Sequence, residues 1–290
     1  MVDIYIDLNT TMNRKEAKTK SDRLLRKMKL HADKKKKAIE TDTYSSYQSL
    51  IPAKIDSKSA KFPLNEYMKA NIILPHPSSY LFIGASGSGK SNTMVWMINQ
   101  LMEDYFDEII IFSGTGGCDD MLNSLTKGPK MKIKVHTTDL INKVTSLLKD
   151  RQKEAEDKGV SKLSRMLVIF EDVSSQKKLL NSVAFIQSYV QLRHFGCSVI
   201  SCSHKLKAVS RLARINANGV VIFPSSVSEK KQLVEEYAPN NLTSREFEQV
   251  IEHAWRDGED MAKPFLFINL KVKQKDRFRR GLHEILQLND

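Results

Sequence analysis

Eight consecutive residues, 84–91, have the composition of a loop that binds phosphate groups. They read Gly-Ala-Ser-Gly-Ser-Gly-Lys-Ser and fit the pattern G-x-x-x-x-G-K-[ST]. The glycines let the backbone curl so that successive N–H groups point at one spot, and the next helix adds the positive end of its dipole. Lys90 is expected to reach the β- and γ-phosphates, and the Ser91 hydroxyl to ligate Mg²⁺. The predicted nucleotide contacts are Gly84, Ala85, Ser86, Gly87, Ser88, Gly89, Lys90, Ser91 and Asn92.

The flanks of this loop have the arrangement that phosphate binding requires. Residues 80–83 form an apolar run typical of a buried strand, and residues 92–102 have the pattern of a buried helix. A strand, a glycine loop and a helix in this order present the loop N–H groups to a ligand. The alternative is a glycine-rich turn that binds nothing, but such a turn has no need of Lys90 and Ser91.

A second apolar segment, 166–170, ends in the two acids Glu171 and Asp172. In P-loop NTPases the strand beside the nucleotide ends in an acid that holds Mg²⁺. A second acid can orient or deprotonate the attacking water. We assign Glu171 to the metal and Asp172 to the water, and the reverse assignment remains open. The alternative is that both acids cap the helix that begins near Ser174 and Ser175.

Two further segments carry candidate catalytic side chains. Residues 198–202 form a strand that runs into Ser203 and His204. In NTPases with an additional catalytic acid, a strand of this kind lies between the loop strand and the acidic strand, and its polar tip senses the γ-phosphate. Arg214 precedes another strand and could act as an arginine finger on a neighbouring subunit. It could equally pair with an acid of its own chain, which would leave Arg193 or Arg211 as the finger.

The composition limits the class of protein. The chain has 290 residues, 41% of them hydrophobic, and no apolar run long enough to span a membrane or to form a signal peptide. Its three cysteines contain no C-x-x-C pair, which favours a reducing, intracellular setting with buried or inert thiols. Residues 14–37 hold twelve Lys/Arg and three Asp/Glu, so this segment carries +9 of the net charge of +12. Such an arm suits nucleic acid, an acidic protein surface or an import receptor, unless it is only a solvated tail.

Strands and helices alternate along the rest of the chain. This pattern predicts an α/β fold, a P-loop NTPase of the RecA/ASCE-like type with a mainly parallel sheet and helices on both faces. We expect a basic N-terminal extension over 1–60, the ATPase domain over 61–272 and a C-terminal tail over 273–290. The expected strands are 80–83, 108–112, 131–135, 165–170, 198–202, 219–223 and 265–270, and the expected helices are 92–102, 138–157, 177–193, 227–237 and 244–255.

Four segments together resemble the genome-packaging ATPases of eukaryotic DNA viruses, a group within the FtsK–HerA superfamily. They are GASGSGKS (84–91), LVIFED (167–172), RHFGCSVISCSH (193–204) and RINANGVVIF (214–223). In this chain His204 stands where the family usually has Gln, and the acids come in the order Glu-Asp. The resemblance implies a homo-oligomeric ring that hydrolyses ATP with Mg²⁺ and drives double-stranded DNA into a preformed capsid. The implied setting is the virion or the cytoplasm or nucleus of a host cell, with a capsid or virion protein as partner.

Two other functions remain open at this point. The chain could be a nucleotide or small-molecule kinase, although no arginine-rich lid insertion is evident. It could also be a nucleotide-gated DNA-binding scaffold in which the Glu171-Asp172 pair does not hydrolyse ATP. The rate of ATP hydrolysis with and without double-stranded DNA distinguishes the three.

Overall fold

The computed structural model describes residues 73–102, 105–114, 125, 131–256, 264–282 and 284–286. The predicted N-terminal extension, residues 1–60, lies outside the described residues, as does Cys118. In the described part of the chain no helix has the length and apolar character needed to cross a membrane.

A single sheet with the strand order β3-β2-β4-β5-β1-β6-β7-β8-β9 organises the described residues. Strands β1 to β6 pair in parallel, whereas β7, β8 and β9 are added in antiparallel fashion at the β6 side. The prediction of a mainly parallel α/β sheet is therefore confirmed. The strands are β1 (Ser79–Ile83), β2 (Glu108–Ser113), β3 (Lys132–His136), β4 (Met166–Glu171), β5 (Cys197–Ser203), β6 (Gly219–Ile222), β7 (Leu266–Asn269), β8 (Phe278–Arg280) and β9 (Glu284–Ile285).

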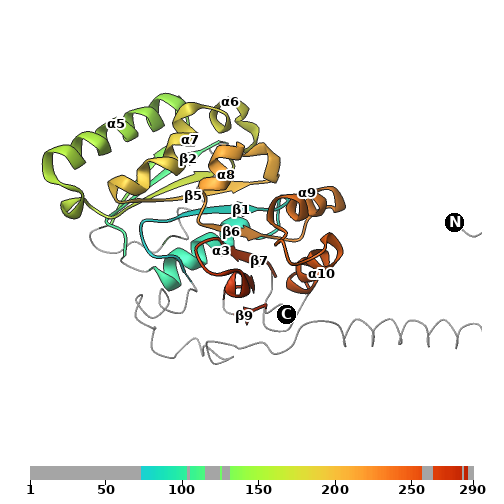
Figure 1. The fold of residues 1–290 in the computed structure, drawn as a ribbon. Coiled ribbons are helices and arrows are strands. Elements are labelled where there is room, and N and C mark those ends of the chain that lie inside the picture. The colour runs from blue at the N-terminus through green and yellow to red at the C-terminus, as the bar shows by residue number, and fades with distance from the viewer. Residues whose placement is uncertain are drawn as a thin grey trace, which may run out of the picture. The chain divides into compact units, whose positions relative to one another are not determined.

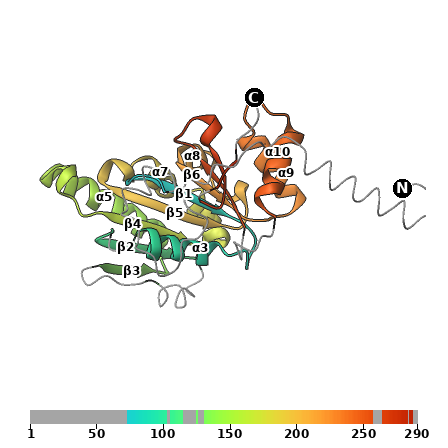
Figure 2. The same cartoon turned by 90° about the horizontal axis from the view of Figure 1, so that it is seen from below.

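Helices cover both faces of this sheet (Figures 1 and 2). Helices α5 (Leu140–Lys158), α7 (Val183–Val190) and α8 (Arg211–Asn216) lie on one face. Helix α3 (Lys90–Trp96) lies on the other face and continues as the π-helical turn η1 (Met97–Leu101). Helices α9 (Val227–Tyr237) and α10 (Ser244–Ala254) complete the fold, and Phe247 of α10 packs edge-on against Phe278 of β8. Shorter helical pieces are η2 (Val160–Lys162), η3 (Val173–Ser175), α6 (Lys177–Leu180), η4 (Leu192–Phe195), η5 (Leu206–Ala208) and η6 (Gln274–Asp276).

The central strands are buried on both faces, as parallel strands under two helical layers must be. All five residues of β1 are buried. Tyr80 and Phe82 belong to the core cluster that also holds Met94 and Met97 of the α3–η1 layer. Burial of each large apolar side chain contributes about 1.5–3 kcal/mol, so this layer holds the loop that precedes α3 against the sheet.

Three parts of the fold differ from the prediction. The helix expected over 177–193 is interrupted because Ser182 caps a new helix by accepting a hydrogen bond from the Phe185 N–H. Helix α8 was not predicted. The sheet also continues beyond residue 272, where a tail was expected, because β8 and β9 pair with β7 and with each other.

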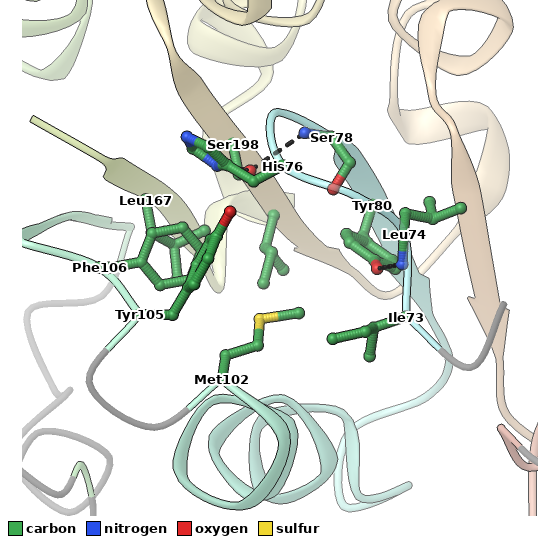
Figure 3. Close-up of a pocket in the computed structure, with 11 residues that line it drawn as sticks. Ile73, Leu74, His76, Ser78, Tyr80, Met102, Tyr105, Phe106, Leu167 and Ser198 are labelled. Atoms are coloured by element: carbon green, nitrogen blue, oxygen red, sulfur yellow. Dashed lines mark hydrogen bonds between the residues drawn. The ribbon is translucent and has the colours of Figure 1, made fainter. Parts of the chain in front are cut away.

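A small apolar cavity lies between the segment that follows η1 and the amino-terminal parts of β1, β4 and β5 (Figure 3). Its volume is about 10 Å³, which is room for about one water molecule. Its polar contacts are satisfied internally, since the Ser198 hydroxyl oxygen lies 2.7 Å from His76 Nδ1 and the Tyr80 hydroxyl accepts a hydrogen bond from the Leu74 N–H. This cavity is part of the core and is too small for a ligand.

Candidate nucleotide-binding site

The strand order brings the ends of three motif-bearing strands together. Strand β5 lies between β1 and β4, with Ile83 opposite Ser203 and Ile169 opposite Ile200. The predicted extra strand between the phosphate-loop strand and the acidic strand is therefore confirmed. Because parallel strands end at the same edge, the residues after Ile83, Phe170 and Cys202 share one crevice, where ligands of open α/β sheets bind.

The phosphate-binding loop begins at the end of β1 and passes directly into α3. Gly89 has φ = 102° and is the N-cap of α3, a backbone conformation that favours glycine. Lys90 is 7% exposed, and its Nζ donates hydrogen bonds of 2.8 Å to the carbonyl oxygens of both Gly84 and Ala85. Burial lowers the pKa of Lys90, while the neighbouring Cys202, Glu171 and Asp172 oppose the shift. The ammonium group is thus held inside the loop at the start of the helix.

Ser91 and Glu171 lie in direct contact. The Ser91 hydroxyl donates a hydrogen bond to Glu171 Oε1, and the buried Glu171 Oε2 has no partner among the described residues. A hydroxyl and a carboxylate are the oxygen ligands that Mg²⁺ prefers, and Mg²⁺ usually keeps several waters. No cluster of three or more His, Cys, Asp or Glu suited to a metal occurs among the described residues. The pair therefore fits a Mg²⁺ ion that keeps water and phosphate ligands.

Asp172 faces His204 instead of Ser91. Its carboxylate Oδ1 lies 3.0 Å from His204 Nε2, and the two side chains are 40% and 35% exposed. The backbone of Asp172 has φ = 46°, and a Cβ on the neighbouring Gly114 would lie 2.3 Å from the Asp172 carbonyl oxygen, so only glycine fits there. The hydroxyl of Ser174 accepts a hydrogen bond of 2.8 Å from the His204 N–H. The close contact of Gly114 with the Asp172 backbone and the hydrogen bond from the His204 N–H to Ser174 thus hold this pair in place.

These groups surround one cavity of about 280 Å³. The lining contains six predicted residues of the loop, the acidic pair and His204, and one residue that was not predicted, Cys202. A signal for Cys202 was its place near the end of β5, the edge where ligands of parallel sheets bind. Burial raises the pKa of the Cys202 thiol, so it stays protonated. The lining residues are Ser86, Gly87, Gly89, Lys90, Ser91, Asn92, Glu171, Asp172, Cys202 and His204.

Arg214 is not part of this cavity. Its guanidinium forms a two-point ion pair with Glu236, with distances of 3.1 Å from Nε and 3.0 Å from Nη2, and donates a hydrogen bond to the Val209 carbonyl oxygen. The side chain is 8% exposed. The geometry therefore matches the alternative in which this arginine pairs with an acid of its own chain. A finger role would require the ion pair to open, and Arg211 is the exposed arginine of α8.

No protein-family model and no curated protein sequence matches this chain. Among solved structures, B204, the DNA-packaging ATPase from Sulfolobus turreted icosahedral virus, aligns with a TM-score of 0.50 and 14% identity over 71% of this chain and 98% of that chain. The fold is that of a P-loop ATPase. The B204 protein of Sulfolobus turreted icosahedral virus 2 in complex with ATP-gammaS aligns at 14% identity over 72% of this chain and 98% of that chain, with a TM-score of 0.46.

ATPase domains 2 and 3 of EssC from Geobacillus thermodenitrificans also align, at 14% identity and a TM-score of 0.49. This alignment covers 73% of the present chain and 40% of the EssC chain. The structural resemblance to packaging ATPases that the sequence predicted is thus confirmed, and at these identities it concerns the fold.

Proposed function

We propose that this chain hydrolyses ATP and uses the free energy to move double-stranded DNA, with the packaging of a viral genome into a capsid as its task. The observation that carries the proposal is that residues of the phosphate-binding loop, the two acids and His204 after β5 line one cavity. The insertion of β5 between β1 and β4 supports the proposal, because it creates that meeting point. The fold similarity to B204, a DNA-packaging ATPase, also supports it.

The residues of the loop bind the triphosphate. Backbone N–H groups of residues 86–91 and the start of α3 attract phosphate oxygens. Lys90 supplies a positive charge beside the β- and γ-phosphates. This charge stabilises the transition state of phosphoryl transfer more than the ground state. Ser91 and Glu171 would hold Mg²⁺, which neutralises charge on the phosphate oxygens when it is bound. Because Glu171 already contacts the Ser91 hydroxyl, it suits the metal better than it suits the water.

Asp172 then takes the role of general base. Its carboxylate is more exposed than that of Glu171 and lines the cavity beside His204. A carboxylate in such a position can orient a water molecule and accept its proton as the water attacks the γ-phosphate. His204 contacts the base directly, so we propose that it holds Asp172 in position and responds to the γ-phosphate from the tip of β5.

The proposed partners follow from charge and from the resemblance. The segment 14–37 carries a net charge of +9 and suits the phosphates of DNA. We further propose that copies of the chain form a ring, that the ring docks on a capsid or virion protein, and that it acts inside the virion or the host cell. Each of these steps depends on the motor function itself.

The ATPase rate, measured with and without double-stranded DNA, tests the proposal. The wild-type protein should hydrolyse ATP, and DNA should raise the rate. Lys90→Ala should abolish turnover, because backbone dipoles alone cannot neutralise the γ-phosphate. The control is Lys149→Ala, a change at an exposed lysine of α5. Turnover that needs a small acceptor would instead support a kinase, and nucleotide binding without turnover would support a scaffold.

A further inference from the structure

A second cavity lies beside the nucleotide site, at the same edge of the sheet. It has a volume of about 510 Å³ and is formed by the loop after β4 with α6 and by the loop after β5 with η5. This volume falls within the range of about 300–1,000 Å³ that bound ligands occupy. The nucleotide-binding loop does not contribute to its lining. Of its lining residues, only His204 has a role in the proposed ATPase mechanism.

The charged lining of this second cavity is basic. Lys177, Lys205 and Lys207 line it, and none of its described lining residues is acidic. Lys177 and Lys205 are exposed, and their ammonium groups form no ion pair with the described residues. Lys207 lies 3.4 Å from Glu235, and both side chains are more than half exposed, so this pair is weak. Asn181 adds a neutral polar group to the lining.

Apart from Glu235, which pairs weakly with Lys207, two acids near the cavity are engaged elsewhere. Glu229 accepts a hydrogen bond from the Leu206 N–H, and Asp172 contacts His204. Lysines that are free of local partners, together with hydroxyl and amide groups, bind phosphate oxygens without reading a base sequence. A phosphodiester backbone is therefore the ligand class that this lining fits best.

His204 connects the second cavity to the nucleotide site, because it lines both. On the nucleotide side His204 Nε2 contacts Asp172 at 3.0 Å. Its backbone N–H donates to the Ser174 hydroxyl, and Ser174 also lines the second cavity. An anion bound in the second cavity thus lies against the imidazole that positions Asp172.

We propose that the second cavity binds backbone phosphates of double-stranded DNA and that His204, acting as a positioning residue, passes this binding on to ATP hydrolysis. The inference rests on the proposed function, since it assumes that DNA is the polymer that the motor moves. The inference names the residues that contact DNA. It also names the residue through which DNA binding changes the rate of ATP hydrolysis. An acidic protein surface is the competing ligand, and it has its own outcome in the test below.

The test compares the double variant Lys177→Gln/Lys205→Gln with the wild-type protein. Its matched control is Lys149→Gln/Lys153→Gln, which removes two exposed lysines from α5 on the helical layer. The basal ATPase rate should stay within about twofold of wild type in both variants, because neither touches the nucleotide cavity. In the cavity variant the DNA dissociation constant should rise at least about fivefold, and the slope of log affinity against log salt should become shallower by about 2.

A third variant tests the route through His204. His204→Ala, which removes the contact with Asp172, should keep the wild-type DNA affinity and salt slope while losing most of the DNA-dependent increase in ATPase rate. A residue with only a structural role in the fold would change both readouts together. Loss of DNA affinity along with stimulation would therefore overturn the assignment of His204 as the connecting residue.

The remaining outcomes separate this inference from the proposed function. A wild-type protein that responds to DNA, with a cavity variant that binds and responds equally well, overturns the inference alone. A wild-type protein that hydrolyses ATP but neither binds nor responds to DNA overturns the proposed function and the inference with it. Equal stimulation by polyglutamate, lost in the cavity variant, would assign the cavity to an acidic protein instead.

Discussion

His204 Nε2 lies 3.0 Å from Asp172 Oδ1, although 32 residues of sequence separate them. The contact joins the tip of β5 to the end of β4 and distinguishes the two acids of the motif, since Glu171 contacts Ser91 instead. Neighbouring carboxylates that differ in their partners are suited to different tasks.

Asp172→Asn should therefore keep ATP binding and lower the turnover rate by about 10²–10⁴, because an amide cannot take a proton from water. Glu171→Gln should instead weaken Mg²⁺-dependent ATP binding. Binding of a fluorescent ATP analogue, titrated with Mg²⁺, and single-turnover hydrolysis measure the two effects separately. If the two phenotypes are exchanged, Glu171 is the general base and the assignment is reversed.

Arg214→Ala should destabilise the protein. The change leaves the Glu236 carboxylate, whose side chain is 20% exposed, without its ion-pair partner, and leaves the Val209 carbonyl oxygen without the Arg214 donor. Loss of such a pair should lower the free energy of unfolding by about 2–4 kcal/mol. Urea denaturation measures it, and Arg211→Ala, at an exposed position of the same helix, should change stability by less than about 0.5 kcal/mol. An Arg214→Ala protein of wild-type stability without turnover would restore the finger role.

Acid should destabilise the fold through His253. Burial lowers the pKa of this imidazole to about 4 from an ordinary value of 6.5, and Arg256 and Arg280 act in the same direction. Between these two pH values the unfolded chain binds a proton that the folded chain does not, so stability falls as the pH falls through this window. One proton corresponds to a slope of at most about 1.4 kcal/mol per pH unit. His253→Gln should therefore lose stability less steeply than wild type when urea midpoints are compared across this window, and equal slopes would refute the prediction.

Deletion of residues 1–40 should weaken DNA binding and leave the basal ATPase rate intact. Every predicted site residue lies beyond residue 83, while residues 14–37 carry +9 of the charge. Each lost phosphate contact should make the salt slope shallower by about 0.9. The filter-binding affinity at several salt concentrations measures this change. An unchanged slope would move the segment to another role, such as nuclear import or docking on an acidic capsid surface.

The local parts of the fold could be predicted from the sequence, because each carries its own signal. Strands β1 and β4 are largely apolar runs, and the glycine loop with Lys90 has a spacing that few other structures need. The prediction that β5 lies between β1 and β4 came from the expected class of NTPase. Periodicity could not give it, because all seven residues of β5 are buried and buried and exposed positions do not alternate.

The missed features depend on partners that are distant in sequence. The sequence left open that Arg214 pairs with an acid of its own chain, but it contains no mark that identifies Glu236, 22 residues away on another helix, as that acid. Strand β8 has only three residues and is stabilised by pairing with β7 and by Phe247. The break at Ser182 did have a local signal, because serine is a strong N-cap residue, but the apolar periodicity on both sides concealed it.

The edge strand β3 has a consequence for how copies of the chain can join. Among the described residues it pairs with β2 alone, and it carries two exposed lysines, Lys132 and Lys134. The Lys134 ammonium group forms an ion pair with Glu108 of β2. Lysines along an edge oppose the addition of a further strand from another molecule. In the proposed ring, a sheet that runs continuously from one copy to the next through β3 is therefore disfavoured, and we expect copies to meet through helices and loops. Two copies that meet through helices and loops can shift relative to each other and separate again. Backbone pairing between their sheets would prevent this movement.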